Sequence, residues 1–222
     1  SSLLSVGFSH DCKYFATGVL NGEVRLWQTD DIKLFSILKG HTAWVWAFAF
    51  SPNNKILASG SADYKINLWD IDSGECIDTL VEHTRKVYSV AFNTDGTLLA
   101  SASEDQSVKI WDVKTRKCKK TLKEHIGSVC CVCFHPANKD IIASAGADGS
   151  IKLWNIHSGE SFATFTGHQK NIYAIDFHRN GELLVSCCAD KTVKLWELTT
   201  GYCKTTLSGL EGKVYKVRFS PN

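Results

Sequence analysis

Residues 40 to 70 read "GHTAWVWAFAFSPNNKILASGSADYKINLWD" and bring His41, Ser59, Asp63 and Trp69 into one short stretch. Histidine, serine and aspartate are the residue types of a nucleophilic hydrolase, so the stretch raises the question of a catalytic site. The same four types recur as His83, Ser101, Asp105 and Trp111, as His125, Ser144, Asp148 and Trp154, and as His168, Ser186, Asp190 and Trp196. A soluble enzyme rarely needs four identical triads, and the repetition therefore indicates a structural role.

The tryptophans give the period of the repeat. Trp27, Trp69, Trp111, Trp154 and Trp196 follow one another at intervals of 42, 42, 43 and 42 residues. A fixed period of this length is typical of repeat architectures. Because the period runs through the chain of 222 residues without a composition shift or a linker, we expect one domain over residues 1–222.

The charge pattern favours neither nucleic-acid binding nor membrane binding. The formal net charge is +2, and Lys and Arg are spread through every repeat. No apolar stretch approaches the roughly 20 residues that span a bilayer, and the N-terminal "SSLLSVGFSHD" has no basic region or cleavage site for secretion. We therefore expect a cytoplasmic protein with neither kind of partner. Position 1 is not Met and the chain holds no Met, from which we expect a piece of a longer protein.

The nine cysteines are interpreted as free thiols that serve mostly as small buried hydrophobic residues. Cys130, Cys131 and Cys133 fall in one expected strand, and Cys76, Cys118 and Cys203 occupy one column of the repeat, which places them on different units. Equivalent atoms of different units lie too far apart for a disulfide. Free thiols agree with a reducing compartment.

Each repeat carries four short apolar runs separated by turn residues, as "VWAFAF", "ILASGS", "INLWDI" and "CIDTL" show. Runs of this length rich in Val, Ile, Phe and Trp predict strands, and four antiparallel strands per unit with apolar residues on both faces predict an all-β fold, a β-propeller. We expect five complete four-stranded blades plus the first strand of a sixth. Their bounds are about 3–38, 43–80, 86–122, 128–165 and 171–207, with the extra strand at 213–219.

The Gly-His before the first strand and the Trp-Asp at the third resemble the signature of the WD-repeat (β-transducin repeat) family, and the resemblance covers the whole chain. It implies that His, Ser, Asp and Trp of each unit form a hydrogen-bonded tetrad inside a blade. The two ends depart from the pattern. Thr17 and Asn21 replace Ser and Asp in the first unit, and Leu210 stands where the next His belongs. We expect the full tetrad to be missing there.

The chain shows no convincing enzyme signal. A catalytic serine must be exposed beside oxyanion donors, whereas Ser59 sits in an apolar strand. No glycine-rich phosphate loop and no His cluster with metal-ligand spacing is present, so we expect no catalysis, no cofactor and no metal.

A break in the alternation of the first strand points to a binding surface. Apolar columns fall at 45, 48 and 50, which predicts a β-bulge that re-aims the side chain at 46. The re-aimed column reads Leu4, Trp46, Tyr88, Cys130, Tyr173 and Tyr215. The column two residues earlier is polar, with Lys86, Ser128, Asn171 and Lys213, except at Trp44. We therefore expect Trp44 to be exposed. The alternative for Trp46 and the tyrosines is that they complete the core.

The resemblance implies that these two columns, with the residue before the turn aspartate, line a face that contacts partners. In this sequence that residue is Leu20, Ala62, Glu104, Ala147 and Ala189 in turn. The predicted site is therefore Trp44, Trp46, Lys86, Tyr88, Glu104, Asn171, Tyr173, Lys213 and Tyr215.

Two functions remain open at this point. The first is a non-catalytic scaffold that binds a protein or peptide at this face. The alternative is an assembly or sensor segment of a larger signalling protein, similar to the WD-repeat arrays of signalling ATPases, although the ATPase motif is absent. Rings of this family are commonly closed by strands from the two termini that complete one blade, and five blades plus one strand do not provide that combination. We expect further blades from the parent chain or another copy to cover the open faces.

Overall fold

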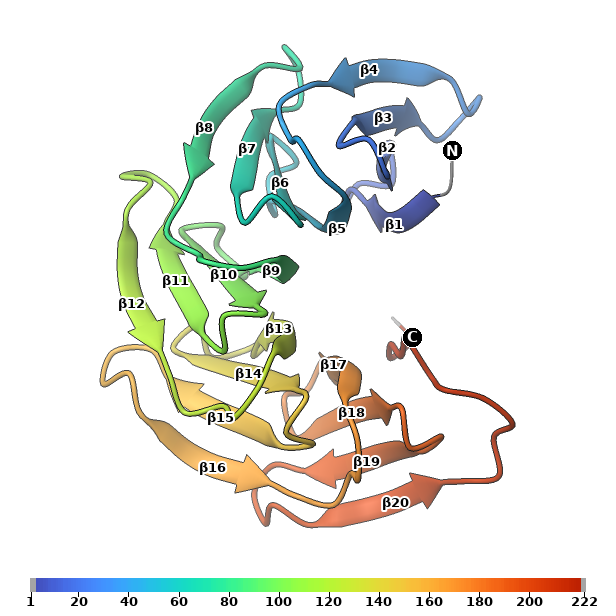
Figure 1. Ribbon diagram of the computed structural model, residues 1–222, viewed down its shortest axis with the longest axis vertical. Coiled ribbons are helices and arrows are strands. Elements are labelled where there is room, and N and C mark those ends of the chain that lie inside the picture. The colour runs from blue at the N-terminus through green and yellow to red at the C-terminus, as the bar shows by residue number, and fades with distance from the viewer. Residues whose placement is uncertain (1–2, 221–222) are drawn as a thin grey trace.

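The computed structural model describes residues 3–220, so positions 1–2 and 221–222 of the predicted domain lie outside the described residues. Figure 1 shows an all-β chain without helices over this range, folded into five antiparallel sheets of four strands each. The predicted blades of a β-propeller are therefore confirmed. Within residues 3–220 there is no helix of the length and apolar character that crossing a membrane requires.

The chain order of the strands is also their order across each sheet, from the inside of the molecule to the outside. Blades 1 and 2 consist of β1 (Leu3–Phe8), β2 (Tyr14–Val19), β3 (Val24–Gln28), β4 (Leu34–Leu38), β5 (Val45–Phe50), β6 (Ile56–Ser61), β7 (Ile66–Asp70) and β8 (Cys76–Leu80). Blades 3, 4 and 5 consist of β9 (Val87–Phe92), β10 (Leu98–Ser103), β11 (Val108–Asp112), β12 (Cys118–Leu122), β13 (Val129–Phe134), β14 (Ile141–Gly146), β15 (Ile151–Asn155), β16 (Ser161–Phe165), β17 (Ile172–Phe177), β18 (Leu183–Cys188), β19 (Val193–Glu197) and β20 (Cys203–Leu207).

The turns between the first two strands of each blade close through an Asp or Asn side chain, as their sequence predicts. Asp95 Oδ1 accepts a hydrogen bond from the backbone N–H of Thr97 at 2.9 Å. Asp11, Asn53, Asn138 and Asn180 accept the equivalent bond. A side-chain oxygen that binds the backbone two residues on stabilises a tight turn, which fixes where the second strand begins.

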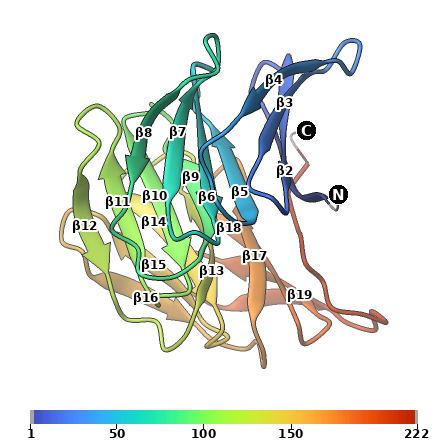
Figure 2. The ribbon, with the colours of Figure 1, turned by 45° about the horizontal axis from the view of Figure 1, so that its top comes forward.

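The core lies between blades and not within them. Leu68 and Trp69 are neighbours in β7, so their side chains point to opposite faces of the sheet. Trp69 packs among residues of blade 1, and Leu68 packs among residues of blade 3. The same arrangement joins blades 3 and 4, and blades 4 and 5. The innermost strands of successive blades lie side by side around the centre (Figures 1 and 2).

The five blades form an open arc, and within residues 3–220 no further blade packs on the outward face of the first or the last blade (Figure 1). Phe8 is 61% exposed, whereas Phe50 at the same position of blade 2 is 4% exposed. Every residue of β20 is exposed. The prediction of apolar burial on both faces is therefore wrong for the outward face of blade 1 and for the outermost strand of blade 5, because no neighbouring blade packs there. The inner strands β17 and β18 of blade 5 are mostly buried.

The prediction of an extra strand at 213–219 is wrong, because these residues do not form a strand. They run beside blade 5, where Val214 N–H donates to the carbonyl of Cys188 at 3.3 Å. Asp176 accepts hydrogen bonds from Arg218 Nη1 at 2.8 Å and from Phe219 N–H at 2.9 Å. The residues described here offer no second strand for this segment to pair with, and a strand needs such a ladder.

The cysteines also differ from their prediction. All nine are free, as expected, but only Cys131, Cys187 and Cys188 are buried. Cys76 and Cys203 lie on outermost strands and are exposed. The prediction of mostly buried thiols is wrong because the outermost strand of a blade faces solvent along its length.

The turns between the second and third strands require a positive φ. Glycine meets this requirement at Gly22 and Gly149, with φ of 87° and 72°, whereas Tyr64, Gln106 and Lys191 adopt φ of 73°, 68° and 68° with a side chain present. A side chain in the left-handed region clashes with its own backbone, so these turns store strain.

Replacing Gln106 by Gly is expected to raise the free energy of unfolding by about 0.5 to 1 kcal/mol, because relief of this clash exceeds the entropy that glycine adds to the unfolded chain. Thermal unfolding would measure the change. Gln169→Gly is the control, since Gln169 is exposed and lacks a positive φ, and it should lower the melting temperature. A melting temperature of Gln106→Gly at or below that of the parent would contradict the strain.

Candidate functional site

The four repeated sets of His, Ser, Asp and Trp form hydrogen-bonded tetrads. In blade 2, Trp69 Nε1–H donates to Ser59 Oγ at 2.8 Å, and Ser59 Oγ lies 2.8 Å from His41 Nε2. His41 Nδ1 lies 2.9 Å from Asp63 Oδ2. The sets of blades 3, 4 and 5 repeat these bonds at 2.7 to 2.9 Å. Since a carboxylate only accepts, Nδ1 carries the proton and Nε2 accepts from the serine hydroxyl.

This order of bonds is that of a catalytic triad, yet the serine cannot act as a nucleophile. The four serines are 0% exposed, so no substrate carbonyl reaches their oxygen atoms. In blade 2 the indole N–H of Trp69 also occupies a lone pair of Ser59 Oγ. An acyl-transfer site needs an accessible oxygen with oxyanion donors near it. The tetrads are therefore elements of the fold, in the role that the sequence resemblance implies.

The tetrads also hold the chain between blades. Asp105 Oδ2, which binds His83, accepts a second bond from the backbone N–H of Thr84, and Asp105 Oδ1 accepts from that of Ser107. Burial opposes ionisation of Asp105, but the hydrogen bonds from His83, from Ser107 and from the backbone N–H of Thr84 hold the pKa of this carboxyl well below its usual 3.8. Asp63, Asp148 and Asp190 have lowered pKa values for related reasons.

The two ends depart from the tetrad as their sequence predicts. In blade 1, Trp27 Nε1–H donates to Thr17 Oγ1 at 2.9 Å, and no His takes part in the described residues. Leu210, at the next His position, is 41% exposed. Among the described blades the incomplete network therefore belongs to blade 1 alone, because blade 5 keeps its full tetrad.

Blade 5 holds a cluster that the sequence analysis missed. Potential ligand atoms of His168, Cys188 and Asp190 lie within 4.8 Å of one another. Cys188 stands where blades 2 and 3 have Ser61 and Ser103, and this change of type in the column was the available signal. Both ring nitrogens of His168 are already bonded, to Asp190 and Ser186. Burial raises the pKa of Cys188, which opposes the thiolate that a metal binds, and so these residues fit a tetrad better than a metal site.

The predicted bulges are present in the first strand of every blade. In blade 2 the pairing register shifts between Val45 and Ala47, at Trp46, and the other blades shift at Leu4, Tyr88, Cys130 and Tyr173. The bulges lie next to the loops that carry the tetrad histidines and aspartates. We call the face formed by these loops and by the β2–β3 turn and its equivalents the upper face.

The structure brings most of the predicted site residues into three groups on the upper face. Trp44 and Trp46 have ring centroids 5.6 Å apart, and Trp46 lies 6.0 Å from Tyr88 in an edge-on arrangement. We call these three residues the aromatic cluster. Tyr173 stacks on Tyr215 at 4.9 Å. Lys86 Nζ lies 4.0 Å from Glu104 Oε2, an ion pair that the sequence analysis did not anticipate. Asn171 and Lys213 are exposed residues outside these groups.

Exposure differs within the aromatic cluster. Trp44 is 46% exposed, which confirms the expectation from its polar column. Trp46 and Tyr88 are half-buried and thus also contribute to the packing around them. The indole Nε1 of Trp46 is buried and has no acceptor among the described residues. Burial, followed by the charge of Glu104, raises the pKa of Tyr88 and keeps its hydroxyl protonated.

A comparison with protein families explains the geometry. The family model described as "WD domain, G-beta repeat" matches residues 1–28, 32–70, 74–112, 116–155 and 159–197. The chain belongs to this WD-repeat family. A search of curated proteins finds no match. WD repeats generally serve as scaffolds for protein–protein interaction and are typically non-catalytic.

The WD repeat is offset from the blade. The second matched segment, 32–70, contains β4 of blade 1 and then β5, β6 and β7 of blade 2. The later segments are divided in the same way. Each WD repeat therefore supplies the outermost strand of one blade and the three inner strands of the next.

Replacing Ser101 by Ala is expected to lower the free energy of unfolding by about 1 to 3 kcal/mol, because it leaves the indole N–H of Trp111 buried without an acceptor. Thermal or urea unfolding would measure the loss, and Ser208→Ala, an exposed position, is the control. An unchanged melting temperature, or an esterase activity abolished by Ser101→Ala, would contradict the structural role.

The protein is expected to lose stability as the pH falls. Desolvation lowers the pKa of His168 below its usual 6.5. The unfolded state therefore takes up a proton from about pH 6.5 downward before the folded state does, and stability falls in that window. The lowered pKa values of the tetrad aspartates add a further loss below about pH 4, where the unfolded carboxyls protonate.

Thermal unfolding measured from pH 8 to pH 3 tests this order of events. His168→Gln should flatten the decline that begins near pH 6.5 and leave the decline below about pH 4 in place. A melting temperature that rises as the pH drops from about 6.5 to 5 would contradict the direction of the His168 shift.

Proposed function

We propose that this WD-repeat chain is a non-catalytic cytoplasmic scaffold whose upper face binds a linear or loop segment of a partner protein, apolar or partly acidic in character. The observation that carries the proposal is the aromatic cluster of Trp44, Trp46 and Tyr88. Tryptophan and tyrosine offer large contact areas with few rotatable bonds, and they are the residues most enriched in binding hot spots.

The half-exposed Trp44 is the anchor of this surface. Its ring rests against Trp46, which is fixed by the bulge in β5, so little conformational freedom is lost when a partner covers it. The polar residues at this column in the other blades would not present such an area. An aromatic side chain that is exposed, held in place and next to a second aromatic ring favours a partner with apolar side chains.

Charged and polar residues elsewhere on the upper face favour acidic groups in the same partner. Lys213 is exposed, and the Lys86–Glu104 ion pair is long and open to solvent. Exposed pairs contribute about 0 to 1 kcal/mol, so a carboxylate of the partner can replace Glu104 at little cost. Asn171 adds amide donors and acceptors on the same face.

Truncation of Trp44 to Ala is expected to weaken binding by about 2 kcal/mol, or roughly thirtyfold in Kd, with little change in melting temperature. Affinity capture from a native lysate with the parent and the variant identifies the partner, and calorimetry then measures the affinity. Phe162→Ala is the matched control, because Phe162 is a 57% exposed aromatic on the outermost strand β16. Normal binding with a strongly lowered melting temperature would show that Trp44 belongs to the core.

Lys86→Glu should act chiefly on the association rate and its dependence on salt, since rim charges steer the encounter more than they hold the complex. Stopped-flow kinetics at two salt concentrations would separate the two effects. An altered dissociation rate with an unchanged association rate would argue against an acidic partner.

The exposed outward face of blade 1 and the exposed outermost strand of blade 5 support a second role, in assembly. Val6 and Phe8 are each 61% exposed on blade 1, and Leu207 is 58% exposed on blade 5. Apolar sheet faces of this kind favour coverage by further blades of the parent chain or of another copy. Sedimentation would show self-association of the 222-residue chain if another copy is the occupant. In the assembly role, Trp44→Ala leaves the stoichiometry unchanged.

The nine free thiols support the cytoplasm as the compartment, because exposed Cys76 and Cys203 persist as thiols in a reducing environment. Fractionation of cells that express the protein, followed by thiol labelling, tests this assignment. Recovery from the medium with oxidised cysteines would overturn it.

A further inference from the structure

A groove of about 360 Å³ opens between blades 3 and 4 on the face opposite the upper face. It lies among the turns that join β9 to β10, β11 to β12, β13 to β14 and β15 to β16, and we call it the lower-face groove. Its volume falls at the low end of the range of about 300 to 1,000 Å³ typical of ligand sites. None of its residues belongs to the upper-face site.

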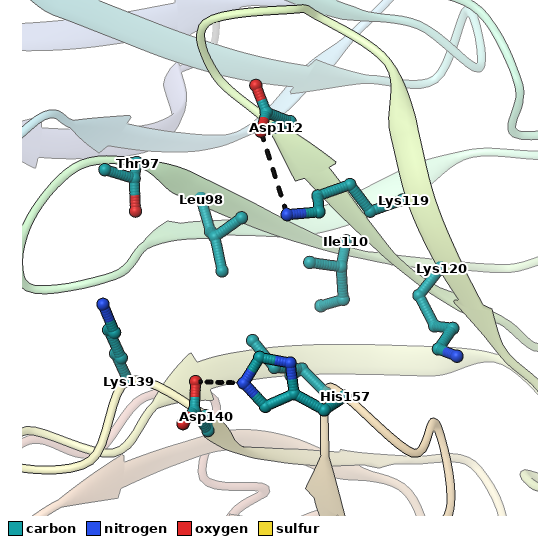
Figure 3. A pocket seen from close by; sticks show the side chains of 10 residues that line it. Thr97, Leu98, Ile110, Asp112, Lys119, Lys120, Lys139, Asp140 and His157 are labelled. Atoms are coloured by element: carbon teal, nitrogen blue, oxygen red, sulfur yellow. Dashed lines mark ion pairs between the residues drawn. The ribbon is translucent and has the colours of Figure 1, made fainter.

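The groove has an apolar floor and a charged rim (Figure 3). Leu98 and Ile110 form the floor, where the core between the two blades reaches the surface. Ile156 of the same core also lines the groove. The rim carries Lys119 and Lys120 from blade 3 and Lys139 and His157 from blade 4, and its acidic residues are Asp112 and Asp140. Cationic side chains thus outnumber carboxylates around the floor.

Both rim carboxylates already have partners. Asp112 Oδ1 accepts from the N–H and hydroxyl of Thr115, and Asp112 Oδ2 lies 3.9 Å from Lys119 Nζ. Asp140 Oδ1 lies 2.9 Å from His157 Nε2. Lys120, in contrast, has neither an ion pair nor a side-chain hydrogen bond among residues 3–220. The groove therefore has an unused positive charge.

The junction between blades 2 and 3 shows how the same position is closed elsewhere. Asp78 stands at the position of Lys120, and Arg116 stands at the position of Gly159. Arg116 Nη1 lies 3.8 Å from Asp78 Oδ2 and donates to the carbonyl of Ile77 at 3.1 Å. An arginine from the turn of one blade thus reaches across the outer strand of the blade before it.

Between blades 3 and 4 the bridge formed by Arg116 and Asp78 has no equivalent, because Gly159 stands at the position of the arginine. Its φ is +82°, and a Cβ atom here would come within 2.9 Å of Lys120 Cε, so the glycine makes room for the lysine stem. The other two junctions combine Ser36 with Gly74 and Ala163 with Gly201. Of the four junctions between described blades, only this one places a cation opposite a glycine.

We propose that the lower-face groove is a second protein-binding site, which takes an acidic linear segment with an apolar side chain between its carboxylates. The apolar side chain covers Leu98 on the floor. The carboxylates bind Lys120 and Lys119, and Lys139 on the other side of the groove. The exposed pairs of Lys119 with Asp112 and of Lys139 with Asp95 are weak, so both lysines exchange partners at little cost. This site is independent of the upper face.

The probe is the fluorescein-labelled peptide acetyl-Glu-Asp-Leu-Glu-Ile-Asp-Glu-amide. The control peptide has the same sequence with Lys at every acidic position. Fluorescence anisotropy with the whole chain should show saturable binding of the acidic peptide, with the lysine peptide at least about tenfold weaker. Binding should weaken as the salt concentration rises from about 50 to about 300 mM, because ions screen exposed charges.

Two variants locate the site. Lys120→Glu reverses the unpaired charge, and Gly159→Arg installs the residue that closes the neighbouring junction. Each should therefore weaken binding of the acidic peptide about tenfold in Kd. Arg116 has φ of 62° at the equivalent position, so arginine is compatible with this turn. Lys120→Ala, with a smaller expected loss, serves if either variant fails to fold.

Matched controls come from blade 5. Lys204→Glu stands at the position of Lys119, and Gly201→Arg stands at the position of Gly159. Both controls, and Trp44→Ala on the upper face, should change the affinity less than about twofold. The proposal is overturned if the acidic peptide does not bind, if both peptides bind equally, or if Lys120→Glu and Gly159→Arg bind as the parent does. Loss of binding in Trp44→Ala alone would also overturn it, since it would place the peptide on the upper face.

Discussion

One buried indole N–H in each complete repeat constrains the rest of the blade. Trp69 has to be buried, because its ring fills the junction with the blade before it, and its N–H then needs an acceptor. Ser59 on the neighbouring strand provides the acceptor. Its hydroxyl then needs an acceptor of its own, which is Nε2 of His41, and the N–H at Nδ1 of His41 in turn donates to Asp63. Since His41 enters from the loop that leaves blade 1, a packing demand inside one blade fixes the path of the chain between two blades.

Much of the fold was predictable because each repeat gives an independent copy of the same pattern, so each strand and turn assignment could be compared across several units. Four-strand units, turn aspartates and bulges all follow from columns in which one residue type recurs. The errors lie where a column loses its neighbours. Phe8 occupies the position of Phe50 but has no packed blade opposite it in the described part of the chain. Residues 213–219 resemble β17, yet residues 3–220 contain no further strand that pairs with them. Whether a side chain is buried or a strand is paired depends on the neighbouring blade or strand. The residues of one repeat column do not show whether that neighbour is present.

The candidate sites were predictable to a different degree. Trp44 was visible because it breaks a polar column, and the structure shows it exposed. The Lys86–Glu104 pair and the groove beside Lys120 were not visible, because each depends on residues from different strands that meet in space. A single repeat contains no signal for such a meeting. It appears only when Asp78 and Arg116 are compared with Lys120 and Gly159 across two junctions.

The offset between WD repeat and blade bears on how such arrays change in length during evolution. Each repeat begins after an exposed turn, completes the blade before it and starts the next. Insertion or deletion of one whole repeat therefore leaves every blade with four strands. Blade number can thus vary while each junction keeps its own residues, as the contrast of Lys120 and Gly159 with Asp78 and Arg116 illustrates.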